Sequence, residues 1–427
     1  MSRILFVDDE PKVLEGLRRM LRGMRHQWDM AFCPGGAEAL ACLDQNPCEV
    51  VVTDMRMPGM DGAELLEELL VRHPATARVV LSGQCEREAV LKAVGPAHQF
   101  LTKPCESEAV KRTLLRIEGL RSRLPDPWHR KIVARLRSLP SPPSLYKQLR
   151  AELDADRPDA DRVASLLARD VAAAAKLLQL VSSSFFGTPK RVGEVRQAAG
   201  LLGLDTLKAV TCCPGVLRPF PDLVDPKAVD WVAAHALRVE AAARRIALSE
   251  THDPMEVGQA ALAGLLHDIG LWVLADAQPE RFAPLPNLVR AKRITFWEAE
   301  RQGGTATHTD LGGYLLGLWG LPDPIVEAAA WHHTPHQSSE AAGKVLAIVH
   351  VANALVEAAE VGLAPEQAAI DHAFLARAGL HDRLGVWCRA AMPLATDEVA
   401  AWGATCPAGC RWTLWRADHD RTRALRR

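Results

Sequence analysis

Polar side chains that could handle phosphate follow several apparent strands in the first hundred residues. Three consecutive valines, at positions 50 to 52, predict a strand that is buried on both faces, and Asp54 stands at its end. Open α/β sheets bind ligands at the carboxyl ends of their strands, so an acid at this position is placed for chemistry. Other apparent strands end in residues of the same polar kind: Asp8 and Asp9, Ser82, and Lys103.

These side chains together suit a phosphoryl group and a metal ion. The carboxylates of Asp8, Asp9 and Asp54 form an oxygen-rich pocket of the kind that Mg²⁺ prefers, with phosphate oxygen as a further ligand. Ser82 and Lys103 add a hydroxyl and a cation for phosphoryl oxygens. Each residue alone has a simpler explanation, because the acid pair could cap the following helix and Lys103 could only form a turn with the next proline. Their convergence at strand ends favours the pocket.

The motif resembles the receiver domain of two-component response regulators. The resemblance rests on Asp8, Asp9, Asp54, Ser82, Phe100 and the Lys103-Pro104 pair. It implies that Asp54 is a nucleophile that takes phosphate from a histidine kinase, with Mg²⁺ held by Asp9 and Asp54. It further implies that Lys103 holds the phosphoryl group, and that Ser82 and Phe100 act as switch residues that relay its presence.

Strand and helix signals alternate five times in residues 1 to 120. Strands are expected near residues 3–7, 28–32, 49–53, 78–82 and 98–102. This alternation predicts a flavodoxin-like, doubly wound, five-stranded parallel sheet. A last helix is expected from Glu106, because Val110, Leu114, Ile117 and Leu120 lie on one of its faces. A linker is expected at residues 121 to 138.

From Trp128 onward the sequence changes to long helical periodicity rich in Ala and Leu, without a comparable strand run. We therefore expect an all-α, HD-type domain at residues 139 to 340 and a helical extension at residues 341 to 427. Several runs resemble the HDOD domain, an output module related to HD phosphohydrolases: Leu139–Pro143, Val163–Asp170, Ala175–Gly187, Ala198–Gly203, Ala263–Gly270, Leu318–Pro322 and Trp331–Pro335. Ser182 and Ser183 stand where this family commonly has Asn-Ser.

The HDOD resemblance also implies a metal cluster. Six residues match the ligands of catalytic HD-type phosphodiesterases: His235, His267, Asp268, His308, His332 and His333. Imidazole nitrogen with carboxylate oxygen suits manganese, iron or zinc, and a pair of such metals can clamp a phosphate ester. Three features depart from the catalytic pattern. Asn353 replaces the last carboxylate, Leu271 replaces a lysine, and no Gly-Tyr-Pro follows the His-His pair.

Two functions remain open for this cluster, beside a purely structural explanation in which buried imidazoles hydrogen-bond to carbonyls. HDOD domains are thought mostly to have lost catalysis and to act through protein contacts. We expect an output domain of that kind, with bound metal and little or no turnover. The alternative is a receiver-controlled, metal-dependent phosphohydrolase or phosphodiesterase that acts on a nucleotide or cyclic dinucleotide.

Composition excludes several other classes of protein. The 427 residues are 48% hydrophobic and carry a formal net charge of −1, so no field for nucleic acid is expected. The basic end, with Arg421, Arg423, Arg426 and Arg427, is offset by neighbouring acids. No apolar run approaches the ~20 residues that span a bilayer, which predicts a cytoplasmic protein without membrane contact. Expected partners are a cognate histidine kinase and a downstream protein, and a homo-oligomer is compatible with the sequence.

Overall fold

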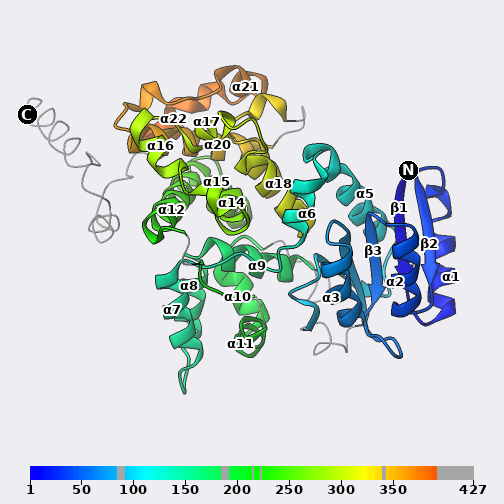
Figure 1. Ribbon diagram of the computed structural model, residues 1–427. Helices are drawn as coiled ribbons and strands as arrows, with labels where there is room; N and C mark the ends of the chain where they lie inside the picture. The colour runs from blue at the N-terminus through cyan, green and yellow to red at the C-terminus, as the bar shows by residue number, and fades with distance from the viewer. Residues whose placement is uncertain (84–91, 184–191, 214–215, 222–223, 339–342, 392–427) are drawn as a thin grey trace, which may run out of the picture.

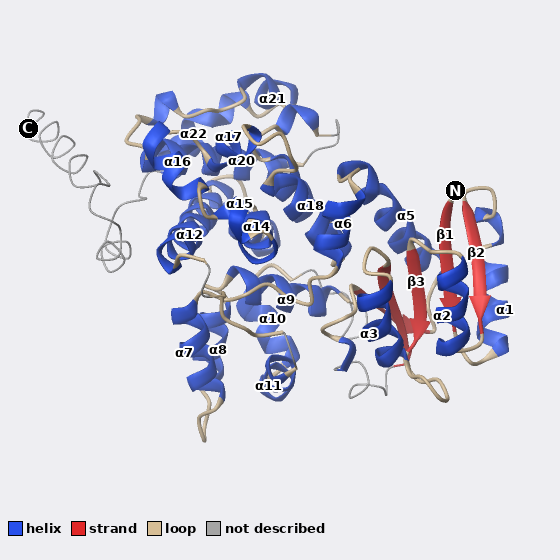
Figure 2. Cartoon of the chain, viewed as in Figure 1, coloured by secondary structure: helices blue, strands red, loops and turns tan. Residues whose placement is uncertain are grey.

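The computed structural model describes residues 1–83, 92–183, 192–213, 216–221, 224–338 and 343–391 (Figure 1). A five-stranded sheet with helices on either side is followed by a domain built of helices (Figure 2). The predicted fold class is therefore confirmed. The basic C-terminal end discussed above lies outside the described residues, as do residues 184–187 of one of the runs quoted for the HDOD resemblance.

The sheet is parallel throughout, with strand order β2-β1-β3-β4-β5. Its strands are β1 (Ser2–Val7), β2 (Trp28–Cys33), β3 (Val50–Asp54), β4 (Ala77–Gly83) and β5 (Gln99–Lys103). Every residue of β3 is buried, as the valine run predicts. Val7 pairs with Thr53 and Asp54 with Leu81, so the carboxyl ends of β1, β3 and β4 meet at one edge.

Helices pack against this sheet. They are α1 (Pro11–Met20), the 3₁₀ turn η1 (Arg22–Met24), α2 (Gly36–Gln45), α3 (Gly62–Arg72) and α5 (Ser107–Arg123). The loop after β3 closes tightly, because a Cβ atom on Gly62 would lie 2.1 Å from the Asp54 carbonyl oxygen. The predicted apolar face of α5 is buried, and Leu120 near its end is only 4% exposed.

The second domain begins with a series of short helices. These helices are α6 (Pro127–Ala134), α7 (Pro143–Leu153), α8 (Ala160–Leu167), α9 (Val171–Ser182), α10 (Val195–Leu202) and α11 (Leu204–Cys212). Helices that build and surround the core follow: α12 (Pro226–Leu248), α13 (Pro254–Leu266), α14 (Ile269–Ala277), α15 (Pro279–Phe282), α16 (Leu285–Lys292), α17 (Phe296–Arg301), α18 (His308–Leu318), α19 (Asp323–Trp331), η3 (Pro335–Gln337) and α20 (Lys344–Glu360). The described chain ends with η4 (Pro365–Gln367), α21 (His372–Arg377), η5 (His381–Arg383) and α22 (Leu384–Ala391).

The core of this domain depends on close helix contacts. Helix α12 packs against α13 and α20, and α18 packs against α14 and α19. A Cβ atom on Gly270 would lie 1.9 Å from the His308 carbonyl oxygen, so glycine at this position lets the starts of α14 and α18 touch. Helix α20 falls in the segment expected as an extension, yet it packs within this core. Helix α6 likewise lies in the segment expected as a linker.

One apolar stretch among the described residues is longer than the sequence analysis expected. Residues Pro254–Ala277 have a mean hydropathy of 1.4 in their most apolar window, enough by length and composition to cross a membrane. The window is 94% buried inside the protein, and the stretch is divided between α13 and α14 at His267 and Asp268. The stretch is apolar because it lies in the core. A buried core helix of a soluble protein has the same apolar character as a membrane span. The expectation that no such run exists was wrong.

Polar side chains join the two domains. The buried guanidinium of Arg78 in β4 donates to the backbone carbonyls of Thr76 and Pro96 and also to that of Ala134 in α6. From α9, Lys176 Nζ donates to the Val94 carbonyl at 2.6 Å. Because these donors reach carbonyls on the far side of the interface, the contact satisfies groups that would otherwise be buried without partners.

Candidate functional sites

The predicted phosphate pocket lies at the carboxyl edge of the sheet. Lys103 Nζ, at the end of β5, lies 2.6 Å from Asp8 Oδ2 and also forms a close ion pair with Asp54 at the end of β3. The other oxygen of Asp54 accepts a hydrogen bond from the backbone amide of Arg56 at 2.7 Å. The pocket therefore holds two acids and one cation in direct contact, with oxygen atoms as the donors available to a hard cation.

Burial and charge oppose each other in this pocket. Asp8 and Asp54 are 1% and 4% exposed. Burial raises the pKa of Asp54, although the Lys103 ammonium and the Arg56 amide act to lower it. Burial alone would lower the pKa of Lys103, but its contacts with Asp54 and Asp8 raise it above its ordinary value. Lys103 is therefore held as a cation beside the acid that would be phosphorylated.

The remaining predicted pocket residues lie at the same edge. Asp9 is half-buried and follows Asp8 directly, and Ser82 is fully buried, one residue beyond the β4 position that pairs with Asp54. Phe100 of β5 is 2% exposed and belongs to the core. The helix-capping alternative for the acid pair does not apply, because Glu10 is the N-cap of α1 and no side-chain cap bond forms there.

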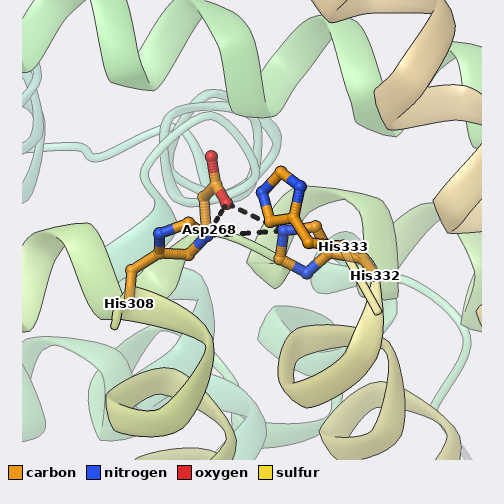
Figure 3. Close-up of side chains that lie close together, drawn as sticks. All are labelled: Asp268, His308, His332 and His333. Carbon is orange, nitrogen blue, oxygen red and sulfur yellow. Dashed lines mark hydrogen bonds and ion pairs between the residues drawn. The ribbon is translucent and has the colours of Figure 1, made fainter. Parts of the chain in front are cut away.

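The predicted metal ligands of the helical domain come together in two groups that share one carboxylate. The three-histidine group contains Asp268, His308, His332 and His333, whose ligand atoms lie within 4.8 Å of one another. Figure 3 shows these four side chains converging, with His308 at the start of α18 and the His332-His333 pair directly after α19. The two-histidine group contains His235, His267 and Asp268 under the same distance limit. All six residues named from the sequence belong to these groups.

The orientation of the imidazoles suits a metal ion. Four of the five rings have an oxygen partner at Nδ1: the Gly264 carbonyl for His267, the Ala328 carbonyl for His332, Glu300 for His308 and Glu360 for His235. Such partners accept the Nδ1 proton, so that Nε2, once it is deprotonated, offers its lone pair to a metal ion. The Nε2 atoms of His235 and His267 then face each other at 3.3 Å, and those of His308 and His332 at 3.5 Å.

Asp268 completes this geometry. Its Oδ1 atom lies 3.1 Å from His308 Nε2 and 3.3 Å from His332 Nε2. The same buried oxygen makes no hydrogen bond of acceptable geometry, so these short distances reflect convergence on a point rather than bonding between the side chains. Facing lone pairs and a shared carboxylate oxygen are what a divalent cation brings together, and the residues present therefore fit a metal.

The pKa values of the cluster histidines are shifted in opposite directions. Burial lowers the pKa of His332 to about 4 and that of His333 well below its ordinary value, which leaves both rings neutral. Burial also opposes a charge on His235 and His308, but carboxylates outweigh it there. Glu360 raises the pKa of His235 to about 9, and Glu300 raises that of His308 well above its ordinary value. Without a metal, His235 and His308 therefore carry a second proton, which a metal ion at Nε2 would have to displace.

Three glutamates at the cluster were missed by the sequence analysis. Glu300 of α17 contacts His308 Nδ1 at 2.5 Å, and Glu360 contacts His235 Nδ1 at 3.0 Å. Glu357 Oε1 lies 3.9 Å from His333 Nε2, and burial raises the pKa of Glu357 to about 8. The helical spacing of Glu357 and Glu360 from Asn353 could have revealed them, whereas nothing in the sequence marks Glu300.

Asn353 and Leu271, two of the residues that depart from the catalytic pattern, lie in and beside the cluster. Asn353 Oδ1 lies 3.0 Å from His235 Nε2, so the amide occupies the place expected of the last carboxylate. Leu271 is 1% exposed and packs in the core of α14, where a lysine would need a buried partner. His267, His308 and His332 have no exposed surface, whereas His333 is partly exposed.

Two family models match the chain. The response regulator receiver domain matches residues 4–115, and the HDOD domain matches residues 139–335. Both matches fall on the regions for which the sequence analysis noted the corresponding resemblance.

Individual proteins are similar to parts of the chain. An uncharacterized protein of Treponema pallidum (strain Nichols) is 26% identical over 210 residues, which cover 49% of this chain and 40% of the relative. The hydrogenase transcriptional regulatory protein HoxA of Cupriavidus necator is 35% identical over 105 residues, 24% of this chain and 21% of HoxA. The chain thus spans less than half the length of both relatives. The solved MmoQ response regulator from Methylococcus capsulatus str. Bath aligns with a TM-score of 0.42 and 20% identity, covering 59% of this chain and 98% of that one.

Proposed function

We propose that this chain, a response regulator that joins a receiver domain to an HDOD domain, is switched by phosphorylation of Asp54. A histidine kinase is the proposed donor, and the cytoplasm is the proposed compartment. The observation that carries the proposal is the contact of Lys103 with both Asp54 and Asp8 at the carboxyl edge of a parallel sheet.

The proposed reaction uses residues already in contact. A carboxylate oxygen of Asp54 attacks phosphorus, the bond to the donor histidine breaks, and an acyl phosphate forms. Lys103, which now pairs with Asp54, then contacts the phosphoryl oxygens, and Ser82 donates its hydroxyl to them. Magnesium held by Asp9 and Asp54 supplies, when bound, positive charge for those oxygens.

A continuous contact leads from this pocket to the HDOD domain. The strand that ends in the pocket, β5, begins with Gln99, whose Nε2 donates to the Leu318 carbonyl of α18 at 3.0 Å. In α5, Arg116 donates to the Leu321 carbonyl and forms an ion pair of 2.9 Å with Asp323. The receiver face made by β5 and α5 is therefore bound to the end of α18 and the loop after it.

Helix α18 continues from that contact to the histidine cluster. It begins at His308, a cluster residue, and ends at Leu318. Its 11 residues span about 16 Å at a rise of about 1.5 Å each. A shift of α5 against the end of α18 therefore reaches the cluster through one rigid element. We propose that phosphorylation acts by this shift on an HDOD surface that a downstream protein binds.

The cluster supports metal binding more than turnover. Its imidazole and carboxylate donors suit manganese, iron or zinc. His267 and His308 are fully buried and only His333 of the three-histidine group is partly exposed, which leaves little of the cluster open to a phosphate ester. We therefore propose that the metal is part of the output domain, which signals by protein contacts, and we do not favour the phosphodiesterase alternative.

Phosphoryl uptake by the full chain tests the switch. With acetyl phosphate and magnesium, intact-mass measurement should find one phosphoryl group per chain on the wild type and none on Asp54→Asn. Asp29→Asn is a matched control, because Asp29 is an acid of β2 with a side chain 63% exposed. Equal labelling of Asp54→Asn and wild type, or an unlabelled wild type, contradicts the proposal.

A further inference from the structure

The ring of His308 is held by a side chain from another helix. His267 and His332 bond through Nδ1 to backbone carbonyls three and four residues earlier in the chain. The Nδ1 atom of His308 instead donates to Oε2 of Glu300 at 2.5 Å. Glu300 belongs to α17, whereas His308 begins α18. The orientation of the His308 ring therefore depends on a residue that its own helix does not supply.

Both carboxylate oxygens of Glu300 serve His308. While Oε2 faces the ring, Oε1 accepts a hydrogen bond of 3.0 Å from the backbone amide of His308. That amide is in the first turn of α18, where amides have no partner within the helix. Glu360, the carboxylate at His235, instead shares its Oε1 atom with Arg238. Glu300 thus fixes the start of α18 and the ring of its first residue together.

These two bonds direct the other ring nitrogen of His308 toward the three-histidine group. His308 Nε2 lies 3.1 Å from Asp268 Oδ1 and 3.5 Å from His332 Nε2. Rotation of the ring by half a turn about its Cβ–Cγ bond would put a carbon atom in this place and break the bond to Glu300. Because Glu300 is only 3% exposed and His308 is fully buried, water does not readily replace the lost partner. The ring is therefore held in the orientation that a metal ion needs.

Helix α17 is itself well anchored beside the cluster. Its start is closed by a capping box, in which Thr295 and Glu298 bond to each other's backbone amides. The ring of Trp297 stacks on that of His333, with centroids 5.4 Å apart and an angle of 16° between the planes. This short helix therefore contacts two histidines of the three-histidine group, one through Trp297 and one through Glu300.

We infer that Glu300 is a positioning residue of the metal site, which holds His308 in the ring orientation and tautomer that present Nε2 to the ion. The inference rests on the part of the proposed function in which the HDOD domain binds metal. Glu300 acts through His308 and is not itself a ligand, because both its oxygens bond to His308. Loss of a partner of this kind weakens metal binding by about 10–100-fold.

Zinc affinity of the full-length protein tests this role without an activity assay. Metal-free protein is titrated with Zn²⁺ in competition with a chromophoric chelator. Glu300→Gln should weaken one zinc-binding step by about 10–100-fold, since an amide offers one acceptor oxygen to the two donors of His308. Glu298→Gln makes the same change at an exposed acid of α17. Asp310→Ala removes a bond of 2.8 Å to the Thr307 amide at the start of α18. Both controls should bind zinc as the wild type does.

A second measurement needs no variant. In zinc-loaded wild type labelled with ¹⁵N at histidine, the ring of His308 should carry its proton on Nδ1 and bind zinc through Nε2. Zinc bound through Nδ1 overturns the inference, even if circular dichroism shows that Glu300→Gln does not fold.

The outcomes separate this role from the metal binding on which it builds. Equal zinc affinity in Glu300→Gln and wild type overturns the role of Glu300 and leaves metal binding intact. A loss of the same size in Asp310→Ala has the same meaning, because it would show that any weakening of the start of α18 suffices. A wild type that binds no zinc overturns both.

Discussion

Gly317 of α18 lies so close to Leu120 of α5 that a Cβ atom on Gly317 would come within 2.4 Å of Leu120 Cδ2. Leu120 closes the apolar face of α5 and is 4% exposed. The contact between the receiver and the HDOD domain therefore depends on the absence of a side chain in one helix. Close packing of Gly317 against Leu120 thus contributes to the interface, together with the hydrogen bond of Gln99 and the ion pair of Arg116.

Gly317→Ala should loosen the contact between the domains. Overpacking of a tight contact costs about 1–3 kcal/mol, so the free energy of unfolding should fall by that order. Leu120→Ala in the same chain should recover part of the loss, because the two side chains share one space. Gly200→Ala is the control, since a Cβ atom there meets nothing within 4 Å. Equal stability of Gly317→Ala and wild type would show that the helices do not pack this closely.

Phosphorylation should change hydrogen exchange in α5 and α18. If the phosphorylated receiver alters the β5–α5 face, backbone amides at residues 107–123 and 308–318 should exchange at different rates with and without acetyl phosphate and magnesium. Asp54→Asn should show no such change. Residues 84–91 lie outside the described residues. Identical exchange in phosphorylated and unphosphorylated wild type argues against transmission along α18.

Removal of metal should destabilise the HDOD domain. A ligand that binds only the folded state raises stability, so a chelator such as EDTA should lower the melting temperature of the wild type. The double variant His267→Ala with Asp268→Ala should contain no metal and should not respond to EDTA. His372→Ala serves as control, because His372 is an exposed histidine of α21. A wild-type melting temperature that is indifferent to EDTA would refute the stabilising role.

Lys176 should make stability depend on pH. Burial lowers the pKa of Lys176 to about 7, against about 10.4 in an unfolded chain. Between these values the unfolded state binds the extra proton, so stability rises with pH from about 7 to about 10. The free energy of unfolding of the wild type should therefore increase relative to Lys176→Met over this window. Lys147→Met, at an exposed lysine of α7, should show no such trend. A constant difference between wild type and Lys176→Met would contradict the lowered pKa.

The α/β fold and the phosphate pocket could be predicted because parallel strands leave a strong pattern. A strand buried on both faces, such as β3, needs an unbroken apolar run, and strands that are parallel must end at the same edge. Asp8, Asp54 and Lys103 could therefore be expected near one another without knowledge of their distances. Their direct contact agrees with that expectation, whereas the role of Asp54 stays a prediction.

The sequence pattern could not predict the histidine cluster or the contact between the two domains. The cluster residues come from α12, the junction of α13 and α14, α18, and the end of α19, and helical periodicity says nothing about distances between helices. Only the family resemblance predicted that they meet. Glu357 was overlooked because a charge on a helix usually faces solvent. Gly317 carries no signal at all, since its importance appears only when Leu120 lies against it.

Arg78 limits how freely the receiver could be exchanged between proteins. Its guanidinium is covered completely and shares three carbonyl oxygens, of which that of Ala134 belongs to α6 and not to the sheet. A chain cut after residue 120 would keep this charge but lose one acceptor and its cover. If the receiver were joined to a foreign output domain, Arg78 would lose the Ala134 carbonyl that accepts its hydrogen bond. The buried charge of Arg78 therefore requires its own neighbour α6. A functional chimera would need either α6 transferred with the receiver or a smaller neutral residue at position 78.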